Sequence, residues 1–226
     1  RGETASLQID CDHHIIKPIE SMGSLMRVSR AQAEENRRIV IEAAGRLFRE
    51  HGFDGIGLND LMGAAGLTQG GFYKQFRSKD DLAVQACDRV LADSAERLTH
   101  IVESGGDDPL ATIVGQYLSC AHRDNVGEGC LFAALGPDAA RQSPELIRSF
   151  ETGIKSYLEI FERAARASST SSEPAVQNDP AVVLSTMVGA LMLSRLVEDE
   201  TLSKRILDSA VSSLLNRHDG LKAEAP

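Results

Sequence analysis

The sequence predicts an all-α protein in which a small N-terminal domain is followed by a larger helical domain. Three observations indicate this fold class. Aromatic residues make up 4% of the 226 residues, tryptophan is absent, and alanine and leucine are common, a composition that suits packed helices. Apolar residues recur at every third or fourth position through the long segments between turn residues, as on one face of a helix. The stretch Leu58–Phe76 has the pattern of two short helices joined by a tight turn.

The first helix is predicted to run from Ser29 to His51 and to end at Gly52, because glycine adopts a left-handed cap cheaply. Residues 1–25 show no sustained period and are predicted to be a disordered extension, so the N-terminal domain is assigned to residues 26–78. The core-facing stripe of the first helix consists of two adjacent rows with i,i+4 spacing: Ile39, Ala43, Leu47 and Val40, Ala44, Phe48.

The two short helices are predicted to form a helix-turn-helix motif. In the first, apolar residues at helical spacing are followed by Gly66, where a left-handed cap is expected. In the second, Thr68 is in position to cap the helix, and Phe72 and Phe76 anchor it inward. The side chains left facing outward are those of Thr68, Gln69, Tyr73, Lys74 and Gln75. Amide, hydroxyl and ammonium groups outside, with phenylalanine inside, are typical of a recognition helix that contacts DNA.

The net charge of −9 is unevenly distributed along the chain. Residues 26–80 carry nine Lys and Arg against seven Asp and Glu, whereas residues 81–226 carry 13 against 22. The helix-turn-helix region is therefore the positive part of an acidic chain. An acidic body behind a positive face would turn that face toward phosphate.

A long helix is predicted after the motif, at residues 79–103, and Ser78 with Asp81 three residues later is its capping signal. Lys79 stands in the first turn, against the helix dipole, and a nearby phosphate would relieve that placement. Because the helix is apolar on two sides, we expect it to bridge the two domains and to carry motion between them.

The rest of the chain is predicted to be helical as well. The apolar run 130–137 is too short for a full amphipathic helix and is predicted to be buried. The helix opened by Asp179–Pro180 is apolar nearly all round, so one side is expected to face the interior and the other a partner chain. The other predicted helices cover residues 110–122, a segment starting at Ser143–Pro144, and residues 202–215.

The segment from Arg37 to Leu82 resembles the DNA-binding domain of the TetR (tetracycline repressor) family of transcriptional regulators. The matching positions are Ala43–Ala44, Leu47–Phe48, Gly52–Phe53, Leu61, Ala65–Gly66–Leu67–Thr68, Gly70, Phe72–Tyr73, Phe76, Ser78–Lys79 and Leu82. The resemblance implies that residues 26–78 bind operator DNA, with an N-terminal arm and Lys79 adding contacts, and that residues 79–220 bind ligand and dimerise. The DNA-binding residues assigned on this basis are Arg27, Arg30, Thr68, Gln69, Gly70, Tyr73, Lys74, Gln75 and Lys79.

Two glycines depart from the family pattern. The family usually has Ser or Thr where Gly57 stands, so the cap of the second helix is expected to be weaker here. It usually has Thr, Ala or Ser where Gly71 stands. The pair Gly70–Gly71 is expected to loosen the recognition helix, because each glycine costs a helix interior about 1 kcal/mol relative to alanine.

The resemblance also implies a ligand cavity in the body and a dimer bundle formed by the last two helices. Candidate pocket residues, for which plain core is the alternative, are Tyr117, His122, Cys130, Phe132, Phe150, Tyr157, Met187 and Leu191. Candidate interface residues are Val183, Val188, Leu193, Ile206, Ala210 and Leu214. For the buried cysteines, a small apolar role is favoured over a sensing thiol.

Other functional classes find little support. No apolar run is long enough to span a membrane, and the four cysteines show no metal spacing or disulfide framework, which suits a reducing cytosol and a cytoplasmic protein. No catalytic signature is visible, so neither an enzyme, a cofactor nor a metal site is expected. We therefore predict a homodimeric transcriptional repressor, released from double-stranded operator DNA by a small, largely apolar effector. The alternative is an effector-independent DNA-binding dimer with a solid core.

Overall fold

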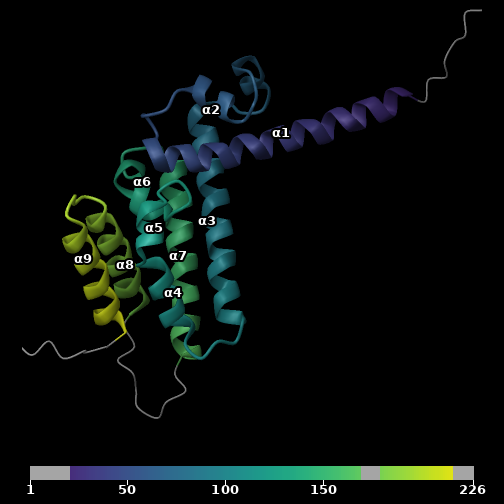
Figure 1. Ribbon diagram of the computed structural model, residues 1–226. Coiled ribbons are helices and arrows are strands. Elements are labelled where there is room, and N and C mark those ends of the chain that lie inside the picture. The colour runs from purple at the N-terminus through teal and green to yellow at the C-terminus, as the bar shows by residue number, and fades with distance from the viewer. Residues whose placement is uncertain (1–20, 169–178, 216–226) are drawn as a thin grey trace, which may run out of the picture. The chain divides into compact units, whose positions relative to one another are not determined.

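The computed structural model describes residues 21–168 and 179–215 of the chain. The chain divides into two compact units, Arg1–Glu35 and Asn36–Pro226, which are described separately. The first helix, α1 (Ser21–His51), begins in the first unit and ends in the second (Figure 1). It starts before the predicted Ser29, so residues 21–25, assigned to a disordered extension, are helical. Extending an existing helix needs no new nucleus, and this stretch contains no proline. Residues 1–20 of the predicted extension lie outside the described residues.

The turn after α2 (Leu58–Ala64) is built as the sequence predicts. Gly66 has a φ of +69°, the left-handed conformation that glycine adopts without strain. The Leu67 N–H donates to the Met62 carbonyl and the Gly66 N–H to the Gly63 carbonyl, each over 2.9 Å. This pair of bonds is a Schellman motif, and it fixes the direction in which the chain leaves α2.

The helix-turn-helix region packs around one apolar core. Ser78 caps the following helix, α3 (Lys79–Glu103), by accepting a hydrogen bond from the Asp81 N–H over 3.0 Å, as predicted. The core side chains are all buried: Val40, Phe48, Leu61, Met62, Phe72, Phe76 and Leu82.

The predicted recognition helix is a 3₁₀ helix, η1 (Gln69–Lys74), and not an α-helix. Its hydrogen bonds include one from the Gly71 N–H to the Thr68 carbonyl (3.1 Å). The adjacent glycines at 70 and 71 explain the difference, because glycine is a poor α-helix former and the tighter helix serves for short pieces. Thr68 has extended backbone at the start of η1, but its side chain makes no capping hydrogen bond, so the predicted cap is wrong.

Replacing Gly71 by alanine is expected to stabilise the protein by about 0.5–1 kcal/mol. A Cβ at this position meets no atom within 4 Å, so the substitution restricts the unfolded chain without a clash in the folded one. Urea unfolding measures the change. Gly66→Ala is the matched control, and it should destabilise because φ is +69° there. Equal losses of stability in the two variants would contradict this account of η1.

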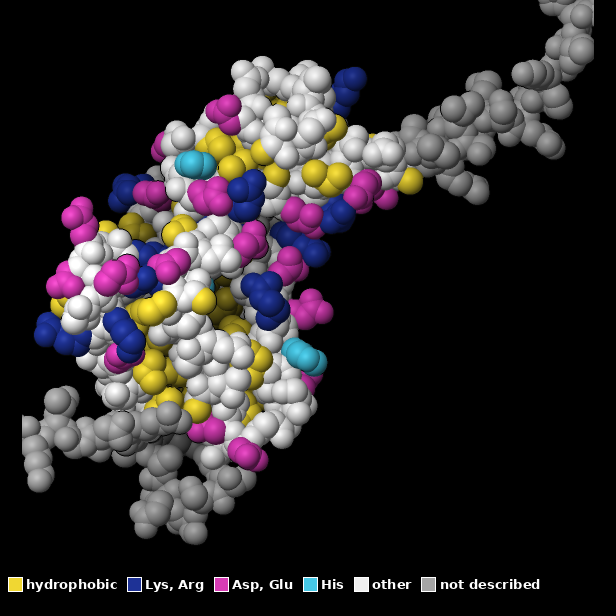
Figure 2. Space-filling model, in the orientation of Figure 1, with side chains coloured by type: hydrophobic (Ala, Val, Ile, Leu, Met, Phe, Trp, Pro, Cys, Tyr) yellow, Lys and Arg dark blue, Asp and Glu magenta, His cyan; other side chains and the backbone are white. Residues whose placement is uncertain are grey.

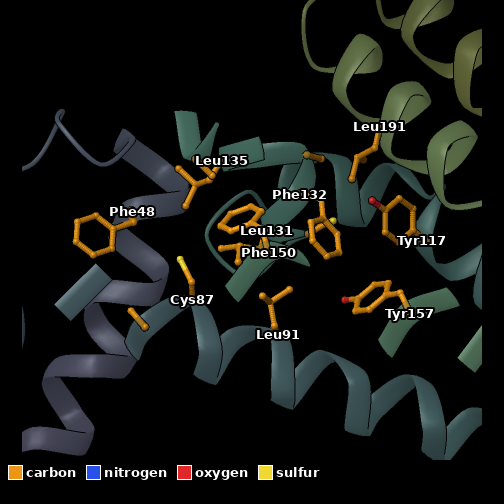
Figure 3. Packing of buried hydrophobic residues seen from close by; sticks show 14 of the residues in the cluster. Phe48, Cys87, Leu91, Tyr117, Leu131, Phe132, Leu135, Phe150, Tyr157 and Leu191 are labelled. Carbon is orange, nitrogen blue, oxygen red and sulfur yellow. The ribbon is translucent and has the colours of Figure 1, made fainter. Parts of the chain in front are cut away.

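The body is built around α3 and α7 (Pro144–Ala167), which pack side by side (Figure 1). Gly153 of α7 lies so close to Leu91 of α3 that a Cβ at 153 would come within 2.8 Å of the leucine side chain. The helices α8 (Pro180–Ser194) and α9 (Glu200–Leu214) pack against each other, and α8 also contacts α7. Figure 3 shows buried side chains that pack together in the core, among them Leu91 of α3, Tyr157 of α7 and Leu191 of α8.

Two body segments differ from the prediction. Residues 110–122 form two helices, α4 (Pro109–Tyr117) and α5 (Cys120–Asp124), because Ser119 starts a new helix by accepting from the His122 N–H over 3.1 Å. In the run 130–137, all residues after Cys130 are helical, within α6 (Leu131–Ala139). Packing of its apolar side chains against neighbouring helices stabilises a helix that would be too short to persist alone.

The outer surface of α8 differs from the predicted dimer interface. Val183, Ala210 and Leu214 are buried within the chain itself, so they are not available to a partner. The reason is that α8 and α9 bury these side chains in their own packing. Val188 and Ile206 are half-buried, and Leu193 is 51% exposed. The large apolar side chains that α8 and the residues after it leave exposed are Val182, Leu193 and Leu196.

Within the described ranges, none of the helices combines the length and the apolar character needed to cross a membrane.

Candidate DNA interface and effector cavity

The recognition segment, residues 68–75, exposes mostly polar side chains and is held to the domain by two buried phenylalanines. Phe72 and Phe76 are buried, with ring centroids 5.3 Å apart. Tyr73, between them in sequence, is 72% exposed. An exposed aromatic ring beside flexible polar side chains is well suited to contact a duplex. The other predicted DNA-binding residues of the segment that are exposed are Thr68, Gln69, Gly70 and Lys74.

Arg37 of α1 holds the end of this segment in place. Its guanidinium donates to the backbone carbonyl of Gln75 and to the side-chain oxygen of Gln85 in α3. The same guanidinium lies over the Phe76 ring, 4.6 Å from the centroid. Sequence reasoning did not single out this role, because it depends on a contact between α1, the segment and α3.

Gln75 does not face outward as predicted. The residue is half-buried, and its side-chain oxygen is buried without a hydrogen-bond partner among the described residues. The reason is that Arg37 draws the Gln75 backbone against the domain. Gln75 thus contributes less exposed surface than the rest of the segment.

Three cations follow one another at the end of the segment: Lys74, Arg77 and Lys79. Lys74 and Arg77 are exposed and Lys79 is half-buried. No carboxylate of the described residues forms an ion pair with any of the three, whereas most other basic side chains of the body have such a partner. Arg77 was not among the predicted contacts, although its position between two predicted cations could have indicated it.

The predicted N-terminal arm residues belong to the other unit. Arg30 is exposed on α1, and the side chain of Arg27 lies outside the described residues. Their contact with DNA stays a prediction.

A cavity of about 220 Å³ opens in the body between α3, α4, α7 and the chain before α6. Of the eight predicted pocket residues, Tyr117, His122, Cys130 and Tyr157 line it. Phe132 and Phe150 stand behind this lining, where the Phe132 ring packs against Tyr157 at 5.2 Å. Met187 and Leu191 do not line it: both are fully buried side chains of α8.

The cavity lining combines apolar and polar groups. Leu98, Ile101 and Ile113 provide an apolar wall, and Arg97 and Glu128 are its charged members. Sequence reasoning missed both charged residues, because nothing in the spacing of α3 or of the loop before α6 places them together. Figure 2 shows hydrophobic side chains reaching the surface of the body between acidic and basic ones.

His122 joins two backbone segments at the cavity. Its Nδ1 donates to the Tyr117 carbonyl over 2.6 Å, and its Nε2 accepts from the Cys130 N–H over 2.9 Å. This pairing requires the neutral ring, since an imidazolium has no acceptor. Burial lowers the pKa of His122 below its ordinary 6.5, and Arg195 and Arg97 reinforce the shift.

The pKa of His122 predicts a loss of stability in mild acid. Below about pH 6.5 the unfolded chain takes up a proton that the folded chain does not bind, so stability falls as the pH drops below that value. Urea unfolding at pH 7.5 and 5.5 should show the loss, and His122→Gln should reduce it. His100→Gln, at an exposed histidine of α3, should keep the wild-type dependence. Identical pH dependence in both variants would contradict the assignment.

The cysteines are poor candidates for reactive thiols. Burial raises the pKa of Cys87 to about 12 and also raises the pKa of Cys130, so both are protonated at neutral pH. Cys120 is exposed. Within the described residues, no group of three or more His, Cys, Asp or Glu side chains is arranged to hold a metal ion.

The loop Gly127–Glu128–Gly129 connects the cavity with the end of α1. Glu128 lines the cavity, and its carboxylate lies 3.7 Å from the guanidinium of Arg49, which is buried in α1. A Cβ at Gly127 would come within 2.3 Å of the Glu50 carboxylate. The loop therefore touches both the cavity and the helix that carries Arg37.

A second hollow, of about 580 Å³, lies between α3 and α7. It is an open groove whose rim carries Asp88 and an ion pair between Arg148 and Glu145 (2.6 Å). The smaller cavity encloses its lining side chains more completely, so it is the better candidate for a small ligand.

The sequence of this chain is similar to those of known transcriptional regulators. Residues 40–86 match the family model described as bacterial regulatory proteins, tetR family. The repressor NemR of Escherichia coli is 26% identical over 135 residues, which cover 58% of this chain and 67% of NemR. The regulator LmrA of Bacillus subtilis is 25% identical over 187 residues, covering 81% of this chain and 98% of LmrA.

Solved structures agree with the sequence comparison. The crystal structure of reduced E. coli NemR matches 80% of this chain and 96% of its own, with a TM-score of 0.68 at 23% identity. AibR, in complex with isovaleryl coenzyme A and operator DNA, matches 80% of this chain and 98% of its own, with a TM-score of 0.54 at 17% identity.

Proposed function

We propose that this chain, a member of the TetR family of DNA-binding transcriptional regulators, is a dimeric repressor that a small effector releases from its operator. The observation that carries the proposal is the joint presence of a recognition segment followed by unpaired cations and a cavity in the body, both of which involve α3. Lys79, at the start of α3, follows the recognition segment, and Arg97 and Leu98 on the same helix line the cavity. AibR, whose crystal structure holds both isovaleryl coenzyme A and operator DNA, supports this combination.

Release requires the effector to favour one arrangement of the dimer. Two recognition segments fit successive major grooves when they lie about 34–36 Å apart, or a multiple of that distance. A ligand that binds the wide arrangement better than the DNA-bound one shifts the population away from DNA. Two connections run from the cavity to the DNA-binding region: α3 itself, and the loop Gly127–Gly129, which packs against α1.

The effector-independent alternative needs a solid core. The cavity of about 220 Å³ favours the effector-controlled regulator instead, since it exceeds the roughly 150 Å³ that accept benzene in an engineered cavity.

Fluorescence anisotropy on a duplex selected by binding tests the proposal. Small molecules are titrated into the protein–DNA complex at fixed salt. The proposal expects at least one compound of cavity size to weaken duplex binding by about tenfold or more, within the usual range of allosteric coupling. A broad panel that leaves the affinity unchanged would favour the solid-core alternative.

A further inference from the structure

The short connection between η1 and α3 is anchored by a relay of hydrogen bonds that begins at Arg37 in α1. The Arg37 guanidinium donates to the Gln75 carbonyl and to the Gln85 side-chain oxygen. The Gln85 amide in turn donates to one oxygen of the Asp81 carboxylate over 3.0 Å, and the other oxygen accepts from the Arg77 N–H over 2.9 Å. One guanidinium is therefore linked to both ends of the connection.

This connection carries cations assigned to DNA or next to them in sequence. Lys74 ends η1, Arg77 lies in the connection, and Lys79 begins α3. The relay holds Arg77 by its backbone N–H, and the Arg77 side chain stays exposed. The relay thus orients the connection and leaves its positive side chains accessible to a duplex.

The recognition segment has few local interactions that would fix its end. Its 3₁₀ helix is six residues long, contains Gly70 and Gly71, and begins at Thr68 without a side-chain cap. Glycine adds backbone freedom, and the hydrogen bonds of a 3₁₀ helix have poorer geometry than those of an α-helix. The last carbonyls of a helix need donors from outside it. Arg37 supplies that donor to Gln75 from a helix far away in sequence.

The shape of the arginine side chain suits this place. The guanidinium is a planar fork with donors on separate nitrogens, and here Nη1 and Nη2 donate to two different elements. The same group is half-buried and lies over the Phe76 ring, 4.6 Å from the centroid. A lysine would keep the charge, but its ammonium is a point charge that lacks the fork.

We propose that Arg37 is a positioning residue for DNA binding: it fixes the connection between η1 and α3 in the conformation that presents Lys74, Arg77 and Lys79 to the duplex. Arg37 itself does not touch DNA. Without it, a smaller fraction of the molecules has the binding conformation, and the apparent dissociation constant rises in inverse proportion to that fraction. This inference rests on the proposed DNA contacts of the recognition segment and names the group that orders them.

Anisotropy of Arg37→Gln on the duplex selected by binding tests the positioning role. The full-length protein is measured over a salt series, at a temperature well below the melting temperature of the variant. We expect binding to weaken by about tenfold or more, which corresponds to a binding-competent fraction of about one tenth or less. The slope of log K against log salt should stay at the wild-type value, because the number of phosphate contacts is unchanged. A slope reduced by about one unit would assign Arg37 a phosphate contact and overturn the proposal, as would wild-type affinity.

Arg37→Lys separates the geometry of the side chain from its charge. We expect this variant to bind nearly as weakly as Arg37→Gln, because the fork is lost in both. Wild-type affinity in Arg37→Lys would show that the charge suffices and would overturn the proposal. Arg89→Gln is the matched control: Arg89 is exposed on α3, one turn beyond Gln85, and pairs with Asp93 over 2.9 Å. It loses the same charge and should bind as the wild type does.

A double-mutant cycle tests the relay. Gln85→Ala removes both the acceptor of Arg37 and the donor to Asp81, and we expect it to weaken binding by about threefold or more. Because the two residues act through one contact, Arg37→Gln/Gln85→Ala should bind about as weakly as Arg37→Gln alone. Single losses that multiply in the double variant would overturn the relay.

The variant Lys74→Glu/Lys79→Glu separates the positioning role from the DNA contacts on which it rests. If the lysine variant weakens binding and Arg37→Gln does not, the DNA contacts are supported and the positioning role is refuted. If neither variant weakens binding, both proposals are refuted.

Discussion

Reversing the charge of Lys74 and Lys79 together is expected to weaken duplex binding by about a hundredfold or more, since the phosphate contacts proposed for the two side chains would be replaced by repulsion. Neither ammonium group has an ion-pair partner among the described residues, so the positive charge is available to DNA. The slope of log K against log salt should also fall by about 2, one unit for each contact. Anisotropy over a salt series measures both quantities for Lys74→Glu/Lys79→Glu.

The matched control reverses two lysines elsewhere. Lys155 and Lys204 are exposed on α7 and α9, where each pairs with a carboxylate four residues away, over 2.5 Å. Lys155→Glu/Lys204→Glu changes the net charge by the same amount, and we expect its salt slope to stay at the wild-type value. If the two double variants lost affinity equally, the effect would arise from overall charge. The assignment of DNA contacts to Lys74 and Lys79 would then be wrong.

Placing a carboxylate on the outer face of α8 is expected to convert the protein into monomers and to weaken operator binding by about 10²–10⁴-fold. That range is the usual gain from linking two binding modules, which a monomer loses. Val182 and Leu193, three helical turns apart, are each 51% exposed, and a Cβ on Gly189 between them meets nothing within 4 Å. We expect a second copy of the chain to cover this apolar stripe.

Sedimentation and anisotropy on Leu193→Glu measure the two effects together. Ile147→Glu is the control, because Ile147 is an exposed apolar residue, 43% accessible, that belongs to α7 and not to α8. We expect it to stay dimeric and to bind DNA as the wild type does. If the Leu193→Glu protein remained dimeric, the dimer interface would have to lie on another surface.

Local capping chemistry explains why much of the fold could be predicted from the sequence. Gly66, Ser78 and Ser143 act through bonds to residues at most five positions away, so the sequence alone contains the relevant partners. The bounds of α3 match the prediction for the same reason. The family resemblance rests on the same stretch, where many spaced positions agree.

Features that depend on distant contacts could not be predicted. Arg195 binds the carbonyl of Arg123, 72 residues away in sequence, and Arg37 reaches Gln75 across 38 positions. The polar half of the cavity and the inward turn of Gln75 follow from these contacts. The pair Gly70–Gly71 indicated a departure from regular α-helix in η1. The prediction was a loosened α-helix, whereas the structure has a 3₁₀ helix.

The central claim is that a two-fold pair of recognition segments meets successive grooves of a duplex, and selection of bound sequences from a random duplex library tests it most directly. We predict enrichment of an inverted repeat whose half-site centres lie about 10–10.5 base pairs, or a multiple of that, apart. Enrichment of a single unrepeated site, or no enrichment at all, would contradict the claim.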